Sequence, residues 1–492
     1  MALPPSHLLR IRPLRAALWF LPAVLVGCGD PAPASSDGEL QLQTSLPLCA
    51  ELADPEPGSC RFATTGFYTS KEPYAPRQSP ASLTPPPEGF KVVMVQHVAR
   101  HGSRALSSPD DDDLMYQLWQ QAKSEGALTP LGELLGPVLD HVLRVHADLG
   151  YGLTSGLGMR EHRETAHRLL ERHPPLFEAM EAEGRRMDVY HSGRERAHES
   201  GEAFVQGLLA RRPGLAPLVD PAQPSFETLY FNAAEGSEAY EAYRRGDTRM
   251  MAAMASIEEH PNTRAMARLM LRPLFSEAFL DRLAAGEFRF QAAADPDDQI
   301  NDELDAAEAL FGLYSIAVGL REEADWDFGR FMHPEAAAWF AYLDDAGSFY
   351  NRGPGFSDEE VTFQRAGVLV ADMLQRIRRL KEGDGSHAVT LRFSHAQALM
   401  PLAAFLGIEG AREGVHPDTL YTYETNPWRL ERVSPMAANV QWDVFRNGEG
   451  VILVRMLHQE GEVQFAPGCR PWEGTRYFHE LGELERCYRP GG

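Results

Sequence analysis

Short apolar runs mark three places along the chain where a buried strand is expected. Residues 92–95 read Val-Val-Met-Val and are bounded by prolines and Gly89 before them and by Gly102 after them. An uninterrupted, β-branched run of this kind is typical of a strand covered on both faces, as in a parallel sheet. Two more runs lie at 187–191 and 388–393. The pattern predicts three buried strands.

Between these runs, apolar residues recur at the spacing of an amphipathic helix. Residues 213 to about 350 show few strand-like runs and many helical ones. Helices are predicted after Thr129, after the glycine-rich segment 152–158, after Arg194 and after Gln397. A further helix is predicted from Ser357, which can cap it, to Gly383. Closing strands are predicted at 440–445, 451–456 and 462–465.

The alternation of these elements predicts an α/β fold with a mainly parallel central sheet flanked by helices, together with a mostly α-helical inserted domain. No internal repeat interrupts it. The predicted divisions are a signal peptide at 1–27, a tether and N-terminal loop at 28–87, the first part of the α/β domain at 88–212, the helical insertion at 213–355 and the second part of the α/β domain at 356–492.

Polar residues follow each predicted strand directly. The first strand runs into R-H-G-S-R at 100–104, the second into Arg194 and Arg196, and the third into Ser394 and His395. Open α/β sheets bind ligands at the carboxyl ends of their strands. Guanidinium groups suit a phosphoryl group, and an imidazole between them can attack phosphorus. A solvated basic turn is the alternative interpretation of 100–104.

Hydrolysis of a phosphate monoester needs a reduction of the barrier by up to ~20 kcal/mol. Without a metal, positioning and charge stabilisation must supply most of it. The site then needs several cations, a nucleophile and an acid for the leaving oxygen. The candidates are Arg100, His101, Arg104, Arg196 and His395, and Gly102 is expected to let the backbone approach the ligand.

Charge argues against one class of partner. The chain has 492 residues, 47 basic and 70 acidic, with a net charge of −23. Residues 1–27 hold three arginines and no acidic residue, so the rest of the chain carries about −26. Nucleic acid is therefore not an expected partner.

The N-terminus has the pattern of an export signal. Three arginines precede the apolar stretch 16–26, and Leu-Val-Gly-Cys at 25–28 resembles a bacterial lipobox. That resemblance implies lipidation of Cys28 and anchoring in a membrane, on the periplasmic side or at the cell surface. An ordinary signal peptide cut elsewhere is the alternative. Residues 29–45 are polar and are predicted to form a flexible tether.

Export permits disulfides. Four cysteines remain besides Cys28, and they can pair in three ways. Proximity in sequence favours Cys49–Cys60 and Cys469–Cys487. No cysteine or histidine cluster has the spacing of a zinc site, so neither a metal nor a cofactor is expected.

Several segments together resemble a known family. The segment 100–104 resembles the signature of the histidine phosphatase superfamily. The order and spacing of further motifs are similar to those of the multiple inositol polyphosphate phosphatases. These motifs are G-L-T-S-G-L-G at 152–158, R-A-H-E-S-G-E-A-F at 196–204, W-D-F at 326–328, Y-L-D-D at 342–345, Y-N-R-G at 350–353, S-H-A-Q-A-L-M-P-L at 394–402 and P-M-A-A-N-V at 435–440.

The resemblance implies an α/β domain with a helical insertion, and stepwise removal of phosphates from phytate and related polyols. It implies that His101 is the nucleophile, with His395 as the second catalytic histidine. Arg100, Arg104 and Arg196 are then phosphate-binding residues. For Arg194, which neighbours them, a solvated position remains the alternative, and for His198 a structural role is expected.

Two positions depart from the family pattern. Leu106 stands where the family has a proline, and Gln397 stands where it has the glutamate that donates a proton. An amide cannot release a proton, so Gln397 is expected only to bind the phosphate or to position the leaving oxygen or a water. The segment Asp110 to Asp113 is an alternative source of an acid, although it is expected to be a solvated turn or helix start.

Three functions therefore remain open. The first is a lipid-anchored phosphatase of inositol polyphosphates. The second is an acid phosphatase with the same site and broader specificity. The third is a lipoprotein that binds phosphoesters but turns them over poorly. Gln397 suggests this function, and the intact nucleophile His101 argues against it.

Overall fold

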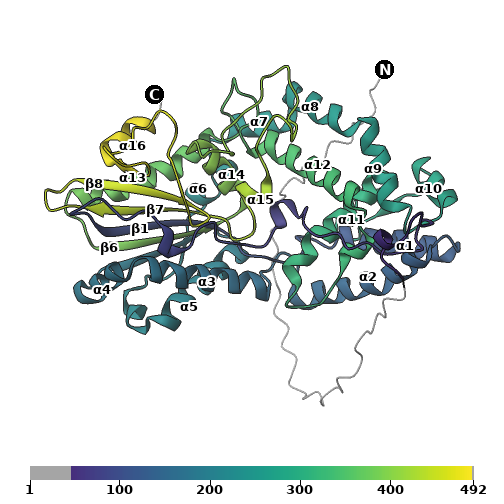
Figure 1. Ribbon diagram of the computed structural model, residues 1–492, viewed down its shortest axis with the longest axis horizontal. Helices are drawn as coiled ribbons and strands as arrows, with labels where there is room; N and C mark the ends of the chain where they lie inside the picture. Colours follow the sequence, from purple (N-terminus) through teal and green to yellow (C-terminus); the bar gives the residue numbers. More distant parts are fainter. Residues whose placement is uncertain (1–45, 490–492) are drawn as a thin grey trace, which may run out of the picture.

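The computed structural model describes residues 46–489, which form an α/β part and a helical part side by side (Figure 1). An eight-stranded sheet lies at the centre of the α/β part, in the order β10-β8-β7-β1-β6-β2-β3, with β9 paired to β8. Its strands are β1 (Lys91–Arg100), β2 (Arg186–His191), β3 (Gln223–Pro224), β6 (His387–Ser394), β7 (Asn439–Arg446), β8 (Ile452–His458), β9 (Gly461–Val463) and β10 (Phe478–Glu480).

Strand direction divides the sheet into two halves. β1, β6, β2 and β3 pair in parallel, which confirms the prediction for the half that carries the three polar strand ends. β7 pairs with β1 in the antiparallel sense, and β8, β9 and β10 continue that half. The predicted closing strands are therefore present and extend the same sheet.

β1 is buried on both faces because its side chains alternate between two cores. Met94 and Val98 belong to one hydrophobic cluster, and Val95 and Ala99 belong to the other. The strand also runs five residues beyond the apolar run. Within that extension, the buried Gln96 keeps its hydrogen bonding by donating from Nε2 to the carbonyl oxygen of Met373 at 2.8 Å.

Helices cover both faces of this sheet (Figure 1). Leu169, Phe177 and Phe204 pack from one side, and Met373 and Leu399 pack from the other. The first group comprises α3 (Gly156–Arg172), α4 (Pro174–Glu183) and α5 (Glu195–Arg211), and the second comprises α13 (Gly367–Lys381), α14 (Ala396–Phe405) and α16 (Leu481–Cys487).

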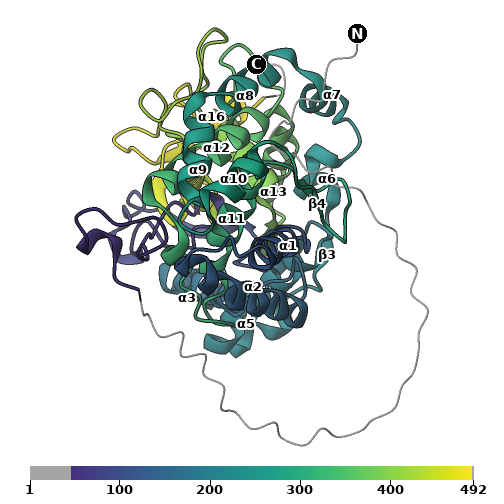
Figure 2. The same ribbon diagram turned by 90° about the vertical axis from the view of Figure 1, so that its right-hand side faces the viewer.

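The helical part is built from two segments of the chain. Figure 2 shows α9 to α12 stacked above α1 and α2, which come from before the predicted insertion. α1 packs against both α2 and α11. The helices are α1 (Asp111–Ser124), α2 (Pro130–Leu149), α7 (Glu238–Gly246), α8 (Thr248–Glu258), α9 (Pro261–Leu271), α10 (Glu277–Ala284), α11 (Glu303–Ala317) and α12 (Pro334–Arg352), with β4 (Phe290–Gln291) paired to β5 (Gln299–Ile300). Two short helices lie outside this part: α15 (Leu430–Val433), and α6 (Phe226–Leu229), which packs against α13 and β6.

The predicted start of the helix at Ser357 is wrong. α13 begins only at Gly367. The preceding residues are held in an extended bridge, in which Phe356 pairs with Val415 and the Ser357 N–H donates to the Val415 carbonyl oxygen at 2.8 Å. A tertiary contact therefore takes the backbone groups that a helical turn would use.

Both favoured disulfides are present, Cys49–Cys60 and Cys469–Cys487. The first closes a loop of the N-terminal segment, and the second ties α16 to the segment after β9. Residues 1–27 and Cys28 lie outside the described residues. Within residues 46–489, no helix combines the length and the hydropathy needed to cross a bilayer.

Gly102 has a role in packing that the sequence did not reveal. A Cβ at Gly102 would lie 2.5 Å from the carbonyl oxygen of Gly158 in α3, and a Cβ at Gly158 would collide with the carbonyl oxygen of Ser103. The glycine thus lets α3 approach the backbone of 100–104. Two glycines face each other because neither backbone has room for a side chain.

Replacing Gly158 by alanine should push α3 away from this loop. We expect the free energy of unfolding to fall by about 1–3 kcal/mol, the usual range for overpacking. Chemical denaturation measures the change. Gly246→Ala is the matched control, because a Cβ there meets no atom within 4 Å. Equal stability of the two variants would contradict this account.

Candidate active site

Two histidines meet where two neighbouring strands end. His101 follows β1 and His395 follows β6, and these parallel strands pair Arg100 with Ser394. The ring centroids of His101 and His395 lie 5.3 Å apart, and both residues are buried. The register of the sheet thus brings together two residues that are almost 300 positions apart in sequence.

One ring nitrogen of His101 is hydrogen-bonded to the backbone. Its Nδ1 lies 2.9 Å from the carbonyl oxygen of Gly102, which can only accept, so Nδ1 is the protonated nitrogen of the neutral ring. Nε2 then keeps its lone pair. Burial lowers the pKa of His101 well below 6.5, and the charges of Arg196, Arg100, His395 and Arg104 lower it further. The imidazole is therefore neutral at mildly acidic pH and can act as a nucleophile.

Arg100 is anchored by the chain around it. The residue is buried, and its Nη1 donates to the carbonyl oxygens of Ser70 at 2.5 Å and Ser434 at 2.6 Å. Burial, and then repulsion from Arg196, lower the pKa of Arg100 to about 9. It therefore carries a positive charge below that pH, in a place where a charge without a counterion is costly.

Arg196 lies in the first turn of α5. Its Nε is buried and has no hydrogen-bond partner among the described residues. Burial lowers its pKa. Within residues 46–489, neither Arg100 nor Arg196 forms an ion pair with a carboxylate, whereas Arg104 donates from Nη1 to the carbonyl oxygen of Ala105 at 2.6 Å. Buried cations without carboxylate partners favour the binding of an anion.

His395 contacts two residues that sequence analysis did not identify. Its Nε2 lies 2.8 Å from Oγ of Ser192, which directly follows β2, and its ring meets Tyr230 edge-on at 5.2 Å. Burial lowers its pKa, as do the charges of Arg196 and Arg100. The position of Ser192 after a strand was a usable signal. Tyr230 lies between α6 and a short 3-10 helix, and no motif marked it.

Arg194 belongs to the edge of this site. It is the residue before α5, and its guanidinium carbon lies 5.9 Å from the ring centroid of Tyr230. Its charge contributes to the lowered pKa of His395. Arg194 is half-exposed, so a role in binding phosphate stays a prediction. His198 is likewise half-exposed and lies near Glu202.

The glycine-rich segment 152–158 supports the loop at 100–104. The Ser155 N–H donates to the carbonyl oxygen of Ser103 at 2.9 Å, and the Ala105 N–H donates to that of Leu153 at 3.0 Å. Glu161 of α3 accepts from both the N–H and the hydroxyl of Ser103, at 2.8 and 3.0 Å. This motif of the resemblance is therefore a scaffold for the residues of the site.

The N-terminal segment supplies a further cation. Lys71 ends a short 3-10 helix (Thr69–Lys71) whose middle residue holds Arg100. Burial lowers the pKa of Lys71, and the charges of Arg104 and Arg100 lower it further, whereas Asp344 raises it. Its backbone is preceded by two non-glycine residues with positive φ, Phe67 at 61° and Thr69 at 52°. Strained backbone of this kind is concentrated at functional sites.

Thr69 ties this segment to the helical part. Its hydroxyl donates to Oδ2 of Asp344 in α12 at 2.5 Å. Lys71, Asp111 and Asp344 line a cavity of about 210 Å³ that is otherwise enclosed by residues of the helical part. Sequence analysis missed Lys71 because residues 71–90 show only a proline-rich loop, in which a lysine has no distinguishing context.

The acidic segment at 110–113 forms the start of a helix, one of the two predicted alternatives, and not a solvated turn. Asp110 and Asp112 are buried, and α1 begins at Asp111. Asp112 accepts from Nδ1 of His146 at 3.0 Å and from the Tyr151 hydroxyl at 2.7 Å. These carboxylates hold the start of α1 in place. Asp111 is the member of the run that borders the cavity beside Lys71.

Leu106 fits the same network. Its N–H donates to Nε2 of His146 at 3.3 Å, while Nδ1 of that ring is bonded to Asp112. Proline has no N–H, so the leucine at this position allows a hydrogen bond that the family's usual residue could not make.

Gln397 is half-buried in the first turn of α14, next to His395.

These features define a class of site. A neutral, buried imidazole lies among arginines at the carboxyl ends of parallel strands, as expected for a histidine that transfers phosphoryl groups. Residues 91–459 match the histidine phosphatase superfamily (branch 2), and the chain therefore belongs to this family and is a phosphatase.

Comparison with individual proteins agrees with this assignment. The chain is 22% identical over 317 residues to multiple inositol polyphosphate phosphatase 1 of Gallus gallus, covering 63% of this chain and 64% of that protein. It is similar to the crystal structure of the Bifidobacterium longum multiple inositol polyphosphate phosphatase in complex with inositol hexasulfate, with a TM-score of 0.80, 30% identity and coverage of 86% and 97%. The phytase from D. castellii shares the fold, with a TM-score of 0.56 at 13% identity and coverage of 86% and 84%.

The lowered pKa of His101 predicts the shape of the pH profile. A histidine with a lowered pKa stays neutral down to that pKa, so the acid limb of kcat/KM should lie well below pH 6.5. The measurement is kcat/KM for an aryl phosphate as a function of pH, corrected for the ionisation of the substrate at about pH 6. Arg196→Gln removes a repelling charge and should move the limb to higher pH.

Arg211→Gln is the control, because Arg211 is exposed at the far end of α5. Its profile should match the wild type. A corrected limb at or above pH 6.5 in the wild type, or one that Arg196→Gln leaves in place, would contradict the electrostatic account of His101.

Proposed function

We propose that this phosphatase hydrolyses the phosphate monoesters of inositol polyphosphates through a phosphohistidine formed on His101. The observation that carries the proposal is the state of the imidazole: buried, neutral, with Nδ1 held by Gly102 and Nε2 available. Arg100, Arg104 and Arg196 surround it with positive charge.

In the first step, Nε2 of His101 attacks phosphorus, and the P–N bond forms as the P–O bond to the inositol breaks. The arginines and His395 stabilise the charge on the phosphoryl oxygens. The inositol oxygen leaves with a proton taken from an acid. In the second step, water attacks phosphorus, the P–N bond breaks, and inorganic phosphate is released while His101 becomes neutral again.

The substrate class is supported by two arguments. Proteins similar to this chain are described as multiple inositol polyphosphate phosphatases, and one of them was crystallised with inositol hexasulfate. The chain also gathers more cations than one phosphate requires, since Lys71 and Arg194 lie near the three central arginines. Additional cations favour a substrate with several phosphates.

The proton for the leaving oxygen is the unusual part of the mechanism. Gln397 cannot supply it. Asp112 is already bonded to His146 and Tyr151, and Asp113 accepts from Gln117 and from the Ala293 N–H. We propose that the substrate supplies the proton itself, from a neighbouring phosphate monoanion. Asp111, beside Lys71, is the alternative donor from the chain.

Two further proposals rest on the sequence. Gln397 in place of a glutamate keeps open a lipoprotein that binds phosphoesters but turns them over poorly. Lipidation of Cys28 after removal of residues 1–27 would anchor the protein at the periplasmic side of a membrane or at the cell surface, through the tether that follows.

His101→Ala should abolish phosphate release from phytate and from an aryl phosphate. In the wild type, rapid mixing followed by an alkaline quench should trap one phosphate per chain on His101, because the P–N bond is acid-labile. Mass spectrometry locates the modification. His198→Ala removes an exposed histidine outside the site and should retain activity. Turnover by His101→Ala, or a wild type that binds phytate without releasing phosphate, would reject the proposed function.

Gln397→Glu should restore a positioned acid. A general acid contributes about 100- to 10,000-fold, so turnover of phytate and of a simple alkyl phosphate should rise toward that range. An aryl phosphate leaves without help and should change little. In the wild type, phytate should be a better substrate than the alkyl phosphate, because it carries its own proton donor.

Asp111→Asn separates the two sources of the proton. It should leave the ratio of phytate to aryl phosphate turnover unchanged if the substrate is the donor. A selective loss with phytate, or no gain from Gln397→Glu with any substrate, would show that the substrate-assisted account is wrong.

A further inference from the structure

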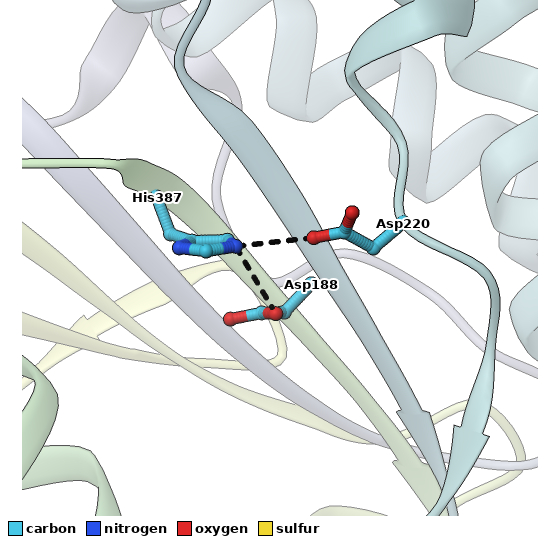
Figure 3. A group of neighbouring side chains, drawn as sticks. All are labelled: Asp188, Asp220 and His387. Atoms are coloured by element: carbon cyan, nitrogen blue, oxygen red, sulfur yellow. Dashed lines mark hydrogen bonds and ion pairs between the residues drawn. The ribbon is translucent and has the colours of Figure 1, made fainter.

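Three potential metal ligands, Asp188, Asp220 and His387, lie close together on the sheet (Figure 3). Asp188 lies on β2, His387 begins β6, and Asp220 lies in the loop before β3. The active-site histidines follow the carboxyl ends of β1 and β6, whereas His387 is at the amino end of β6. The two sites are thus separated by the length of a strand.

The donor atoms face one another. Nε2 of His387 lies 3.1 Å from Oδ2 of Asp220 and 3.5 Å from Oδ1 of Asp188. Figure 3 shows the imidazole edge directed between the two carboxylates. A tetrahedral Zn²⁺ with bonds of about 2.0–2.1 Å separates its ligand atoms by roughly 3.3 Å. The two observed separations lie on either side of that value.

The proton on the imidazole is placed by its neighbour. The Ser386 hydroxyl donates to Oδ1 of Asp384 at 2.6 Å, so its oxygen can only accept from Nδ1 of His387, at 3.0 Å. Nδ1 therefore carries the hydrogen, and Nε2 of the neutral ring points a lone pair at two carboxylate oxygens. A positive group between these three atoms, either a proton or a metal ion, is needed to remove the repulsion.

The other carboxylate oxygens are held from outside. Oδ1 of Asp220 accepts from Nε of Arg186 at 2.7 Å, and Oδ2 of Asp188 accepts from Nη1 of Arg376 at 2.5 Å. Each aspartate thus directs one oxygen to an arginine and the other toward His387. Metal ligands are commonly oriented in this way by outer hydrogen bonds, including the one on the distal nitrogen of the histidine.

We propose that Asp188, Asp220 and His387 form a Zn²⁺ site that joins β2, β6 and the segment leading to β3. An imidazole among the ligands favours Zn²⁺ over Ca²⁺ or Mg²⁺, which prefer oxygen. The side chain of His387 is 34% exposed, which leaves room for water as the fourth ligand. The two arginines offset the charge of the two carboxylates, so the affinity should be moderate, and a proton on Nε2 is the competing occupant.

The test uses the untagged chain after dialysis against a chelator. Isothermal titration with Zn²⁺ at pH 7.5 should show one ion bound per chain. Saturating Zn²⁺ should raise Tm by a few °C, since a ligand that binds only the folded state stabilises it. Co²⁺ should give the intense visible absorption of a tetrahedral complex, and this measurement can be made on the wild type alone. Phosphatase activity should not depend on the ion, because the site lies away from His101.

His387→Gln and Asp188→Asn should each abolish the stoichiometric binding and the rise in Tm. His198→Gln is the matched control. It removes a half-exposed histidine from a separate pair, His191 and His198, whose rings lie 4.7 Å apart. That variant should bind Zn²⁺ as the wild type does. If the wild type binds neither Zn²⁺ nor Co²⁺ stoichiometrically, the proposal is wrong and Nε2 of His387 carries a proton instead. Binding that survives His387→Gln or is lost in His198→Gln would place the ion elsewhere.

Discussion

The concentration of positive charge around His101 is the constraint on which the rest of the structure depends. Arg100 and Arg196 are drawn into a buried site without carboxylate partners among the described residues, so burial and mutual repulsion both act against them. The chain compensates with backbone carbonyls, such as those of Ser70 and Ser434 on Arg100. Carbonyls fix the position of a guanidinium while leaving its charge to be neutralised by a phosphate.

That arrangement explains why several distant segments converge on one loop. The segment 152–158 holds 100–104 through backbone hydrogen bonds, and the facing glycines at 102 and 158 allow the helix to come close. The Ala437 N–H also donates to the carbonyl oxygen of His101 at 3.0 Å. A nucleophile in a charged site must be held against repulsion, and backbone contacts do this without adding charge.

At the other end of the sheet, two carboxylates and two arginines alternate around His387. The proposed Zn²⁺ would bind at Nε2 of His387, between the two carboxylates. Parallel strands place their carboxyl ends together at one edge of the sheet and their amino ends at the other. The same register that brings His101 beside His395 therefore brings His387 near Asp188.

The sequence alone was sufficient for the strands, the family and the central residues of the site. Buried parallel strands are continuous apolar runs, and the polar residues that follow them are at strand ends by necessity. His101, Arg100, Arg104, Arg196 and His395 could therefore be identified from local pattern. The departure at Gln397 was equally visible, because it is a change in chemical type at a fixed position in a motif.

Other features depended on contacts between distant segments, which local pattern does not encode. Tyr230 reaches the site through the packing of α6 against α13 and β6, and Lys71 reaches it through the N-terminal segment. The start of α13 at Gly367 follows from the bridge between Phe356 and Val415. The burial of Asp112 and the zinc-like cluster at His387 likewise need a partner far along the chain. Sequence determines which groups are available, and tertiary structure decides which of them meet.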